Sequence, residues 1–179
     1  MEILIATYHL HAIIDHFTIA LCGTGIFADL VGYIILYVFG NMSVLARRLS
    51  DRLRRAAIVL LIPGALSAVL SRLTGESEAE RVWDSISPAA QQILLSDNST
   101  RWFFSHAVLG TYLMYALVAL AAWRAVLEIW AKIQRTQSVY LTMAIIVLCA
   151  LLYQGKTGGD LVYGHRVGTN TAATAQRDP

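Results

Sequence analysis

The chain has 179 residues, of which 56% are hydrophobic and only 15% are charged. A soluble domain usually carries about 45–50% apolar and about 25% charged residues, so this composition excludes an ordinary water-soluble globular protein. A membrane-spanning helix needs about 20 apolar residues, and the length therefore allows one domain with at most about five spans. The formal net charge is only +2. The Lys and Arg residues form no basic stripe, which argues against a nucleic-acid partner.

Four apolar stretches predict membrane-spanning helices, at about 12–39, 56–73, 102–124 and 138–155. The first is interpreted as a retained span, because neither a basic segment before it nor a cleavage site after it indicates a signal peptide. Pro63-Gly64 interrupts the second stretch, and neighbouring helices usually compensate for such a break. We expect an all-α, up-down-up-down four-helix membrane bundle that forms a single domain over residues 1–166, with a loose tail at 167–179. No internal repeat is visible.

The polar segment 74–100 separates the second and third spans. Ser77 and Glu80 have the spacing of a capping box, and apolar residues then recur at helical spacing from Val82 to Ile93. We therefore expect a short amphipathic helix there, lying on the membrane surface.

Basic residues are distributed unevenly between the two sides of this bundle. Five arginines lie between the first two spans: Arg47, Arg48, Arg52, Arg54 and Arg55. Arg124, Lys132 and Arg135 fall on the same side, whereas the opposite side has an excess of acidic residues. Short basic loops stay in the cytoplasm, so the sequence predicts a bacterial inner-membrane protein with both termini on the periplasmic side.

All five histidines fall on the side opposite the arginines. His9, His11 and His16 open the first span, His106 opens the third, and His165 follows the fourth. Ionisable groups within a membrane are costly and usually functional. The layer of histidines indicates a haem or a metal ion near the outer face.

Helical spacing favours haem over a bare ion. His16 is followed by Ala20 and Gly23 at i+4 and i+7, and His106 is followed by Gly110 at i+4. Small residues beside an imidazole leave room for a flat macrocycle, whose iron takes two axial histidines from facing helices. We expect His16 and His106 to be one pair of ligands for a b-type haem, with Gly23 and Gly110 beside it.

The remaining histidines could bind a second haem or could be spare, so the expected number of haems is one or two. His11 and His165 are the expected second pair, whereas His9 is assigned no ligand role. No CxxCH motif is present, which excludes covalent c-type haem in this chain.

Three further features have structural interpretations. Cys22 and Cys149 lie inside spans, where a free thiol behaves as a small apolar residue. Asp29 is about 20 Å deeper than His16, and it is interpreted either as a hydrogen-bonding partner across helices or as part of a proton or quinone path. Gly158-Gly159 is expected to form a turn with close backbone packing.

Two motifs resemble those of a known family. HAIIDHFT, from His11 to Thr18, resembles the HPxxxHFP opening of a family of small four-helix bacterial membrane proteins of unknown function. GGDLVYGHRVG, from Gly158 to Gly168, resembles its GGxLVYxHGVG closing motif. His106 and Asp29 also match residues of that family. Ala12, Thr18 and Arg166 depart from the family pattern, and the two lost prolines make the entry to the first span more regularly helical.

The resemblance implies a haem- or metal-binding membrane module beside periplasmic c-type cytochromes and respiratory complexes. The residues themselves favour electron transfer by haem b and no independent enzyme activity, and the acidic segment 74–100 suits a basic soluble cytochrome or the surface of a larger complex. Together with the resemblance, this gives a c-type cytochrome or a larger respiratory or photosynthetic complex as the expected partner. Two alternatives stay open. One is a non-redox structural or assembly subunit, and the other is a copper, zinc or iron site made from the same histidines with Asp15 or Asp160.

Overall fold

The computed structural model describes residues 10–85, 106–130 and 135–163. This part of the chain forms four helices, which are α2 (Leu10–Phe39), α3 (Val44–Ser85), α5 (His106–Ile129) and α6 (Gln137–Tyr163). All four are long and apolar enough to cross a membrane. The expected four-helix membrane bundle is thus confirmed.

The second helix is longer than its apolar run. The arginine-rich segment that separates the first two apolar stretches is mostly helical, and only residues 40–43 turn the chain between α2 and α3. Gly40 is required in this turn, because a Cβ there would lie 2.2 Å from the carbonyl oxygen of Leu36. Arg47 then donates a hydrogen bond from Nε to the carbonyl of Gly40.

The expected start of a separate surface helix at Ser77 is wrong. α3 continues through this position to Ser85, and the hydroxyl of Ser77 donates back to the carbonyl of Thr74 at 2.9 Å. Its hydroxyl is therefore occupied as in a helix interior. The rest of the expected surface helix, residues 86–93, and the expected tail, residues 167–179, lie outside the described residues.

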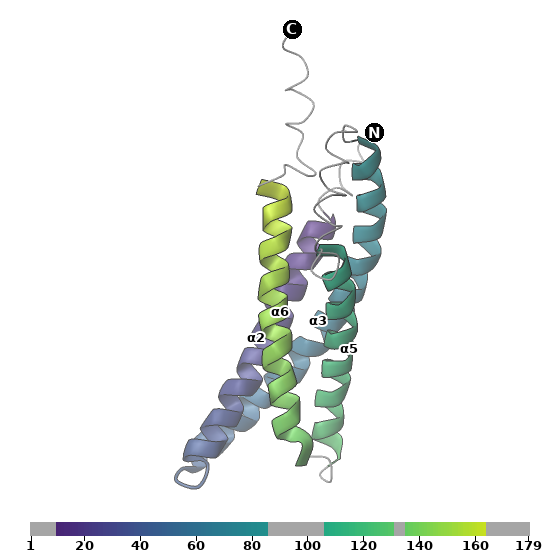
Figure 1. Cartoon of the computed structure of the whole chain (residues 1–179). Coiled ribbons are helices and arrows are strands. Elements are labelled where there is room, and N and C mark those ends of the chain that lie inside the picture. Colours follow the sequence, from purple (N-terminus) through teal and green to yellow (C-terminus); the bar gives the residue numbers. More distant parts are fainter. Residues whose placement is uncertain (1–9, 86–105, 131–134, 164–179) are drawn as a thin grey trace.

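The four helices form two antiparallel hairpins that stand side by side (Figure 1). α2 packs along α3, α3 against α5, α5 against α6, and α6 against α2. α2 and α5 therefore occupy one diagonal of the bundle, and α3 and α6 the other. The starts of α2 and α5 lie at the same end as the ends of α3 and α6, and at the opposite end the α2–α3 hairpin leans away from α5 and α6.

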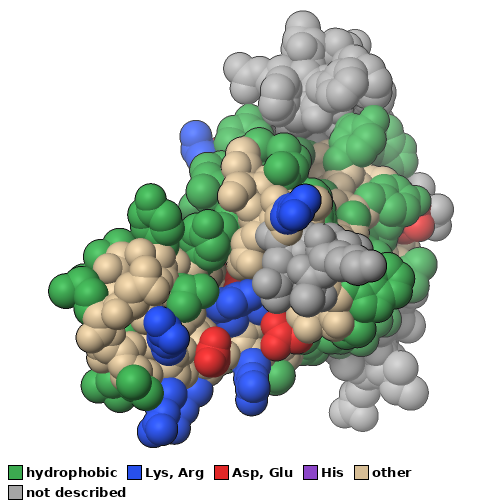
Figure 2. Space-filling model, turned by 90° about the horizontal axis from the view of Figure 1, so that it is seen from below, with side chains coloured by type: hydrophobic (Ala, Val, Ile, Leu, Met, Phe, Trp, Pro, Cys, Tyr) green, Lys and Arg blue, Asp and Glu red, His purple; other side chains and the backbone are tan. Residues whose placement is uncertain are grey.

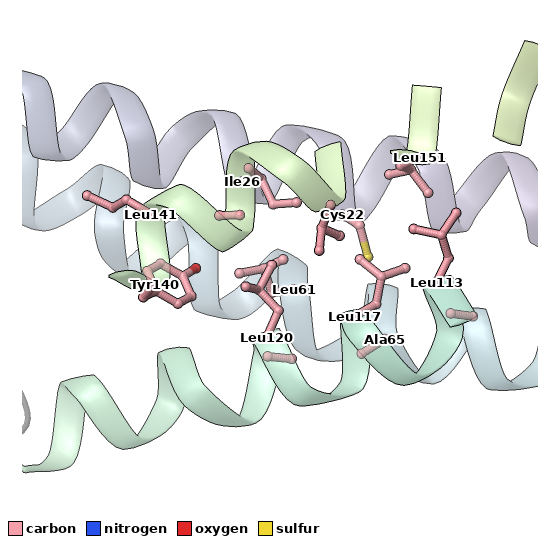
Figure 3. Packing of buried hydrophobic residues seen from close by; sticks show 14 of the residues in the cluster. Cys22, Ile26, Leu61, Ala65, Leu113, Leu117, Leu120, Tyr140, Leu141 and Leu151 are labelled. Atoms are coloured by element: carbon pink, nitrogen blue, oxygen red, sulfur yellow. The ribbon is translucent and has the colours of Figure 1, made fainter. Parts of the chain in front are cut away.

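The core is built from inward-facing stripes with spacings of three and four residues, as in other helix bundles. Figure 3 shows the packing of Cys22, Ile26, Leu61, Leu117 and Tyr140 from all four helices. Cys22 lies against Gly64, where a Cβ would be 2.5 Å from the Cys22 sulfur. Both cysteines lie inside spans as expected, Cys22 buried in the bundle and Cys149 exposed on its outside. Gly64 lets α2 and α3 approach closely despite Pro63.

The outside of the bundle is largely apolar. Large exposed side chains such as Phe27, Val59, Leu66 and Ile146 are distributed over its sides, which implies contact with lipid. Figure 2 looks at the end where α2 turns into α3 and shows Lys and Arg side chains gathered there beside hydrophobic ones. The charge asymmetry of the sequence therefore corresponds to one end of the molecule.

Candidate functional site: a histidine layer at one end of the bundle

His11 is held by two consecutive residues of α3. Its Nδ1 lies 3.3 Å from Oγ1 of Thr74. The imidazole covers Gly75, where a Cβ would come within 2.8 Å of Cε1 of His11. A larger residue at position 75 would therefore displace the ring.

His106 is held in the same way by α6. Its Nδ1 lies 3.3 Å from Oγ1 of Thr157, and a Cβ on Gly158 would be 2.9 Å from Cε1 of His106. Residues Gly158 and Gly159 are part of α6, so the expected turn there is wrong. The close packing expected of this pair is found at Gly158, because the ring of His106 occupies the space above it.

The two hairpins thus repeat one local arrangement that the sequence does not display as a repeat. In each hairpin a histidine near the start of the first helix packs on a Thr-Gly pair near the end of the second helix. A polar residue stands three positions before each threonine, Ser71 in α3 and Gln154 in α6. We call these two arrangements the histidine seats.

Hydrogen bonding within the seats fixes the histidine tautomer. Oγ1 of Thr74 lies 2.9 Å from the carbonyl of Leu70 and 3.1 Å from that of Ser71, and a hydroxyl has one proton to give. The hydroxyl of Thr74 therefore accepts from Nδ1–H of His11. Thr157 donates to the carbonyl of Gln154 at 3.0 Å and accepts from Nδ1–H of His106 for the same reason.

Both imidazoles consequently have an unprotonated Nε2, whose lone pair can accept a hydrogen bond or bind a metal. In the described part of the chain no group donates a hydrogen bond to Nε2 of His11. Nε2 of His106 lies 3.4 Å from the amide nitrogen of Gln154, which also donates to the backbone carbonyl of His106 at 2.9 Å. The Gln154 amide reaches this position because Gly110 has no side chain, as a Cβ there would be 3.0 Å from it.

Other polar side chains surround the two seats. Ser71 donates to Asp15 at 3.0 Å, and Arg72 donates to Thr111 at 2.8 Å while pairing with Glu76. His106 is within electrostatic reach of both Asp15 and His11. These side chains and the two seats together form the histidine layer, which draws on all four helices.

The structure does not bring His16 into this layer. The side chain of His16 is exposed, and its Nδ1 contacts the carbonyl of Ala12 in its own helix at 2.6 Å. Gly23 packs near Leu148 of α6, 3.9 Å from where its Cβ would be. The expected pairing of His16 with His106 is thus replaced by a layer that contains His11 and His106. His9 and His165 lie outside the described residues.

A second polar layer lies toward the arginine-rich end of the bundle. Nε of Arg124 is 2.9 Å from Oδ2 of Asp29, and both side chains are 1% exposed. Arg124 also donates to the carbonyl of Arg54 at 3.0 Å, and Asp29 interacts with Tyr140. Asp29 therefore does bond across helices, as one of its two interpretations predicted, whereas Arg124, assigned to the cytoplasmic side by the sequence, is buried in the bundle.

The donor set of the histidine layer suits ligation by two imidazoles. Within residues 10–85, 106–130 and 135–163, no three His, Cys, Asp or Glu side chains come together as a site for a metal ion. A site for a bare ion generally uses three or four protein ligands, whereas a haem iron needs two at most. A ligating histidine usually donates its other ring N–H to an oxygen, as His11 and His106 both do.

Comparison with known proteins assigns the chain to a family. The family model described as "Predicted membrane protein (DUF2231)" matches residues 7–171. No curated protein and no solved structure matches the chain.

Proposed function

The chain belongs to this DUF2231 family of predicted membrane proteins, and we propose that it is a b-type haem protein that transfers electrons near one face of the membrane. The observation that carries the proposal is the pair of histidine seats. Two imidazoles on the diagonal helices α2 and α5 lie in one layer, each with Nδ1–H donated to a threonine. His11 and His106 would hold the iron through Nε2.

A haem iron held by these two imidazoles would supply one-electron redox chemistry without binding a substrate. The chain's own residues would position and insulate it. Thr74 and Thr157 hold the tautomer and the ring orientation, and Gly75 and Gly158 let the rings lie close to the helix backbones. The amide of Gln154 would turn away from Nε2 of His106 and keep its bond to the backbone carbonyl.

A second haem has less support. His16 is exposed on α2, so a second site that used it would lie on the outside of the bundle. One haem at the two seats is the part of the proposal that rests on the contacts described above.

We place the histidine layer on the periplasmic side of a bacterial inner membrane. The proposal rests on the arginines at the opposite end, since short basic segments are retained in the cytoplasm. A basic c-type cytochrome, or a larger respiratory or photosynthetic complex, would then be the electron-transfer partner at the acidic outer side, where Glu76 is exposed.

A haem assay on matched histidine variants tests this function. Protein produced with haem supplied and purified in detergent should give a b-type pyridine haemochrome and a sharp reduced spectrum. His11→Ala and His106→Ala should each lose the haem or convert it to high spin, because each removes one of the two imidazoles that would hold the iron. His16→Ala, on the same helix as His11, should keep the haem of the seats.

Gel filtration in detergent shows whether each variant still folds, since the apolar spans and not the histidines determine insertion. Colourless wild-type protein would contradict the haem proposal, and metal analysis of that protein would then distinguish a copper, zinc or iron site from a purely structural subunit. Full haem content in both His11→Ala and His106→Ala would refute the ligand assignment.

A further inference from the structure

The polar layer around Arg124 contains more hydrogen-bond donors than acceptors. One fully buried carboxylate, Asp29, faces two guanidinium groups, those of Arg124 and Arg54. Glu128 also accepts from Arg124, at 3.2 Å, but its side chain is 42% exposed at the rim. Five buried donor atoms of this layer are without a hydrogen-bond partner in the described residues. Nε of Arg124 and the hydroxyl of Tyr140 both lie beside Asp29, which leaves Oγ of Ser50, Nε of Arg54 and Nε2 of Gln137.

Arg54 is the cation that lacks a paired anion. Its side-chain hydrogen bond runs from Nη2 to the amide oxygen of Gln137 at 3.4 Å. Arg124 already pairs with Asp29 at 2.9 Å, and no carboxylate of the described residues lies within ion-pair distance of Arg54. A partly buried guanidinium without a counter-charge is costly in a membrane protein, so an anion at this place would stabilise the bundle.

The unpartnered donors come from opposite corners of the bundle. Ser50 and Arg54 are four residues apart on α3 and so share one face, whereas Gln137 is at the start of α6. Gly32 of α2 allows the close approach of α3, because a Cβ there would be 3.0 Å from Cγ of Arg54. Arg54 and Gln137 therefore bridge the two hairpins, since their side chains are hydrogen-bonded to each other.

Position in the membrane indicates which anion is available. Arg54 and Arg55 immediately precede the apolar run of α3, which is where the boundary between hydrocarbon and headgroups is expected. The leaning tip of the α2–α3 hairpin exposes Tyr37, Met42 and Leu45, at 81%, 80% and 75%. Exposed arginines surround the tip at positions 47, 48, 52 and 55, and Figure 2 shows basic and hydrophobic side chains together at this end.

We propose that Arg54, Gln137 and Ser50 bind the phosphate of an anionic phospholipid between the two hairpins, in the leaflet on the arginine-rich side. The guanidinium fork suits phosphate oxygens, and the amide and hydroxyl supply two more donors. The lipid's acyl chains would lie along the exposed apolar sides of the helices. Basic sites between helices at the cytoplasmic ends of bundles suit such headgroups, and this site is independent of the proposed haem.

Lipid titration of matched arginine variants tests the proposal. Full-length protein, depleted of lipid in detergent, is titrated with phosphatidylglycerol or phosphatidylcholine while its unfolding temperature is recorded. Phosphatidylglycerol should raise the unfolding temperature of the wild type above the value in phosphatidylcholine. Arg54→Gln should weaken the apparent affinity for phosphatidylglycerol by about tenfold or more, as loss of a charged hydrogen-bonding group implies.

Arg55→Gln is the control, because it removes the same charge from an exposed neighbouring position and should leave the affinity nearly unchanged. In phosphatidylcholine alone, Arg54→Gln should be at least as stable as the wild type, since it removes a partly buried cation that has no carboxylate of the described residues within ion-pair distance. Gln137→Leu, which keeps both arginines, should also weaken phosphatidylglycerol binding.

Three results would overturn the proposal. An equal loss of affinity for phosphatidylglycerol in Arg54→Gln and Arg55→Gln would indicate general attraction to an anionic surface. An unchanged affinity in both Arg54→Gln and Gln137→Leu would exclude the site. An equal rise in unfolding temperature with inorganic phosphate would assign the anion to free phosphate instead of lipid.

Discussion

Each threonine of the histidine seats has a single hydroxyl proton, and the carbonyls of its own helix already accept it. The threonine oxygen is therefore an acceptor for Nδ1–H, and Nε2 becomes the ligating nitrogen of the histidine. This role was not visible in the sequence, because threonines within helices commonly bond to their own backbone whether or not another helix uses them. Thr142, which donates to Ser138 at 3.0 Å and contacts no histidine in the described residues, is an example.

Replacing these threonines should change the histidine tautomer. Thr74→Val leaves Nδ1–H of the half-buried His11 without its acceptor. A fully buried donor would lose about 1–3 kcal/mol in this way, and a half-buried one loses less, so the Nε2–H tautomer of His11 should become populated. Thr74→Ser should preserve the wild-type tautomer. Nitrogen-15 NMR of histidine-labelled protein in detergent measures the two ring nitrogens directly and requires no haem.

Thr142→Val serves as the matched control, since it removes a helical hydroxyl that has no histidine beside it. Thr157→Val should affect His106 less than Thr74→Val affects His11, because the Gln154 amide still donates to Nε2 of His106. Unaltered nitrogen shifts for His11 in Thr74→Val would show that another group fixes its tautomer.

At the level of the helices, the sequence predicted which segments span the membrane but not which face of each points inward. Apolar runs determine the spans, and all four helices formed around them. The choice of His16 as a ligand relied on the small residues Ala20 and Gly23 beside it. The inward face of α2 instead follows the stripe that contains His11, Thr18, Cys22 and Asp29, and His16 is rotated away from that stripe.

The burial of Arg124 had a recognisable signal as well. It continues the inward stripe of α5 through Leu113, Leu117 and Leu120, and Asp29 is an acid in a span that needs a partner. The helix ends were harder to predict, because α3 and α6 extend through polar and glycine-containing sequence. In those segments the packing of the histidine rings on Gly75 and Gly158 takes the place of an apolar pattern.

The contact between α2 and α3 should be most sensitive to substitution at Gly64. In Gly64→Ala the new Cβ would lie 2.5 Å from the sulfur and 3.1 Å from the backbone nitrogen of Cys22. The backbone of Cys22 cannot rotate away from the new Cβ. We therefore expect the free energy of unfolding to fall by about 1–3 kcal/mol, as in other overpacked sites. Unfolding of the purified protein in detergent, followed by tryptophan fluorescence, measures the change.

Gly159→Ala is the control, because nothing lies within 4 Å of its added Cβ and alanine favours a helix. It should be neutral or slightly stabilising. Adding Cys22→Ala to Gly64→Ala removes the nearest atom and should restore part of the loss. Equal stability of Gly64→Ala and the wild type would show that α2 and α3 do not require this close approach.

Across the whole molecule, two polar layers are separated by an apolar core. His11 and Asp29 are eighteen residues apart on α2, which corresponds to about 27 Å along the helix. No described contact connects the layers. Between them lie the hydrophobic cluster of Figure 3 and a buried polar contact, in which Thr18 donates to Ser67 at 2.9 Å. The histidine layer and the arginine-rich end therefore lie in opposite leaflets. The direction in which the bundle inserts decides which aqueous compartment each of them faces.

That direction can be measured with single cysteines at the two ends. Ser43, in the α2–α3 turn, and Ser77, near the end of α3, are both exposed. In a Cys22→Ala, Cys149→Ala background, a membrane-impermeant thiol reagent added to intact cells should label Ser77→Cys, and it should label Ser43→Cys only after the membrane is opened. The reason is the retention of the arginines of α3 in the cytoplasm. The cysteine-free background is the negative control. Labelling of Ser43→Cys in intact cells would put the histidine layer on the cytoplasmic side and remove the basis for a periplasmic cytochrome partner.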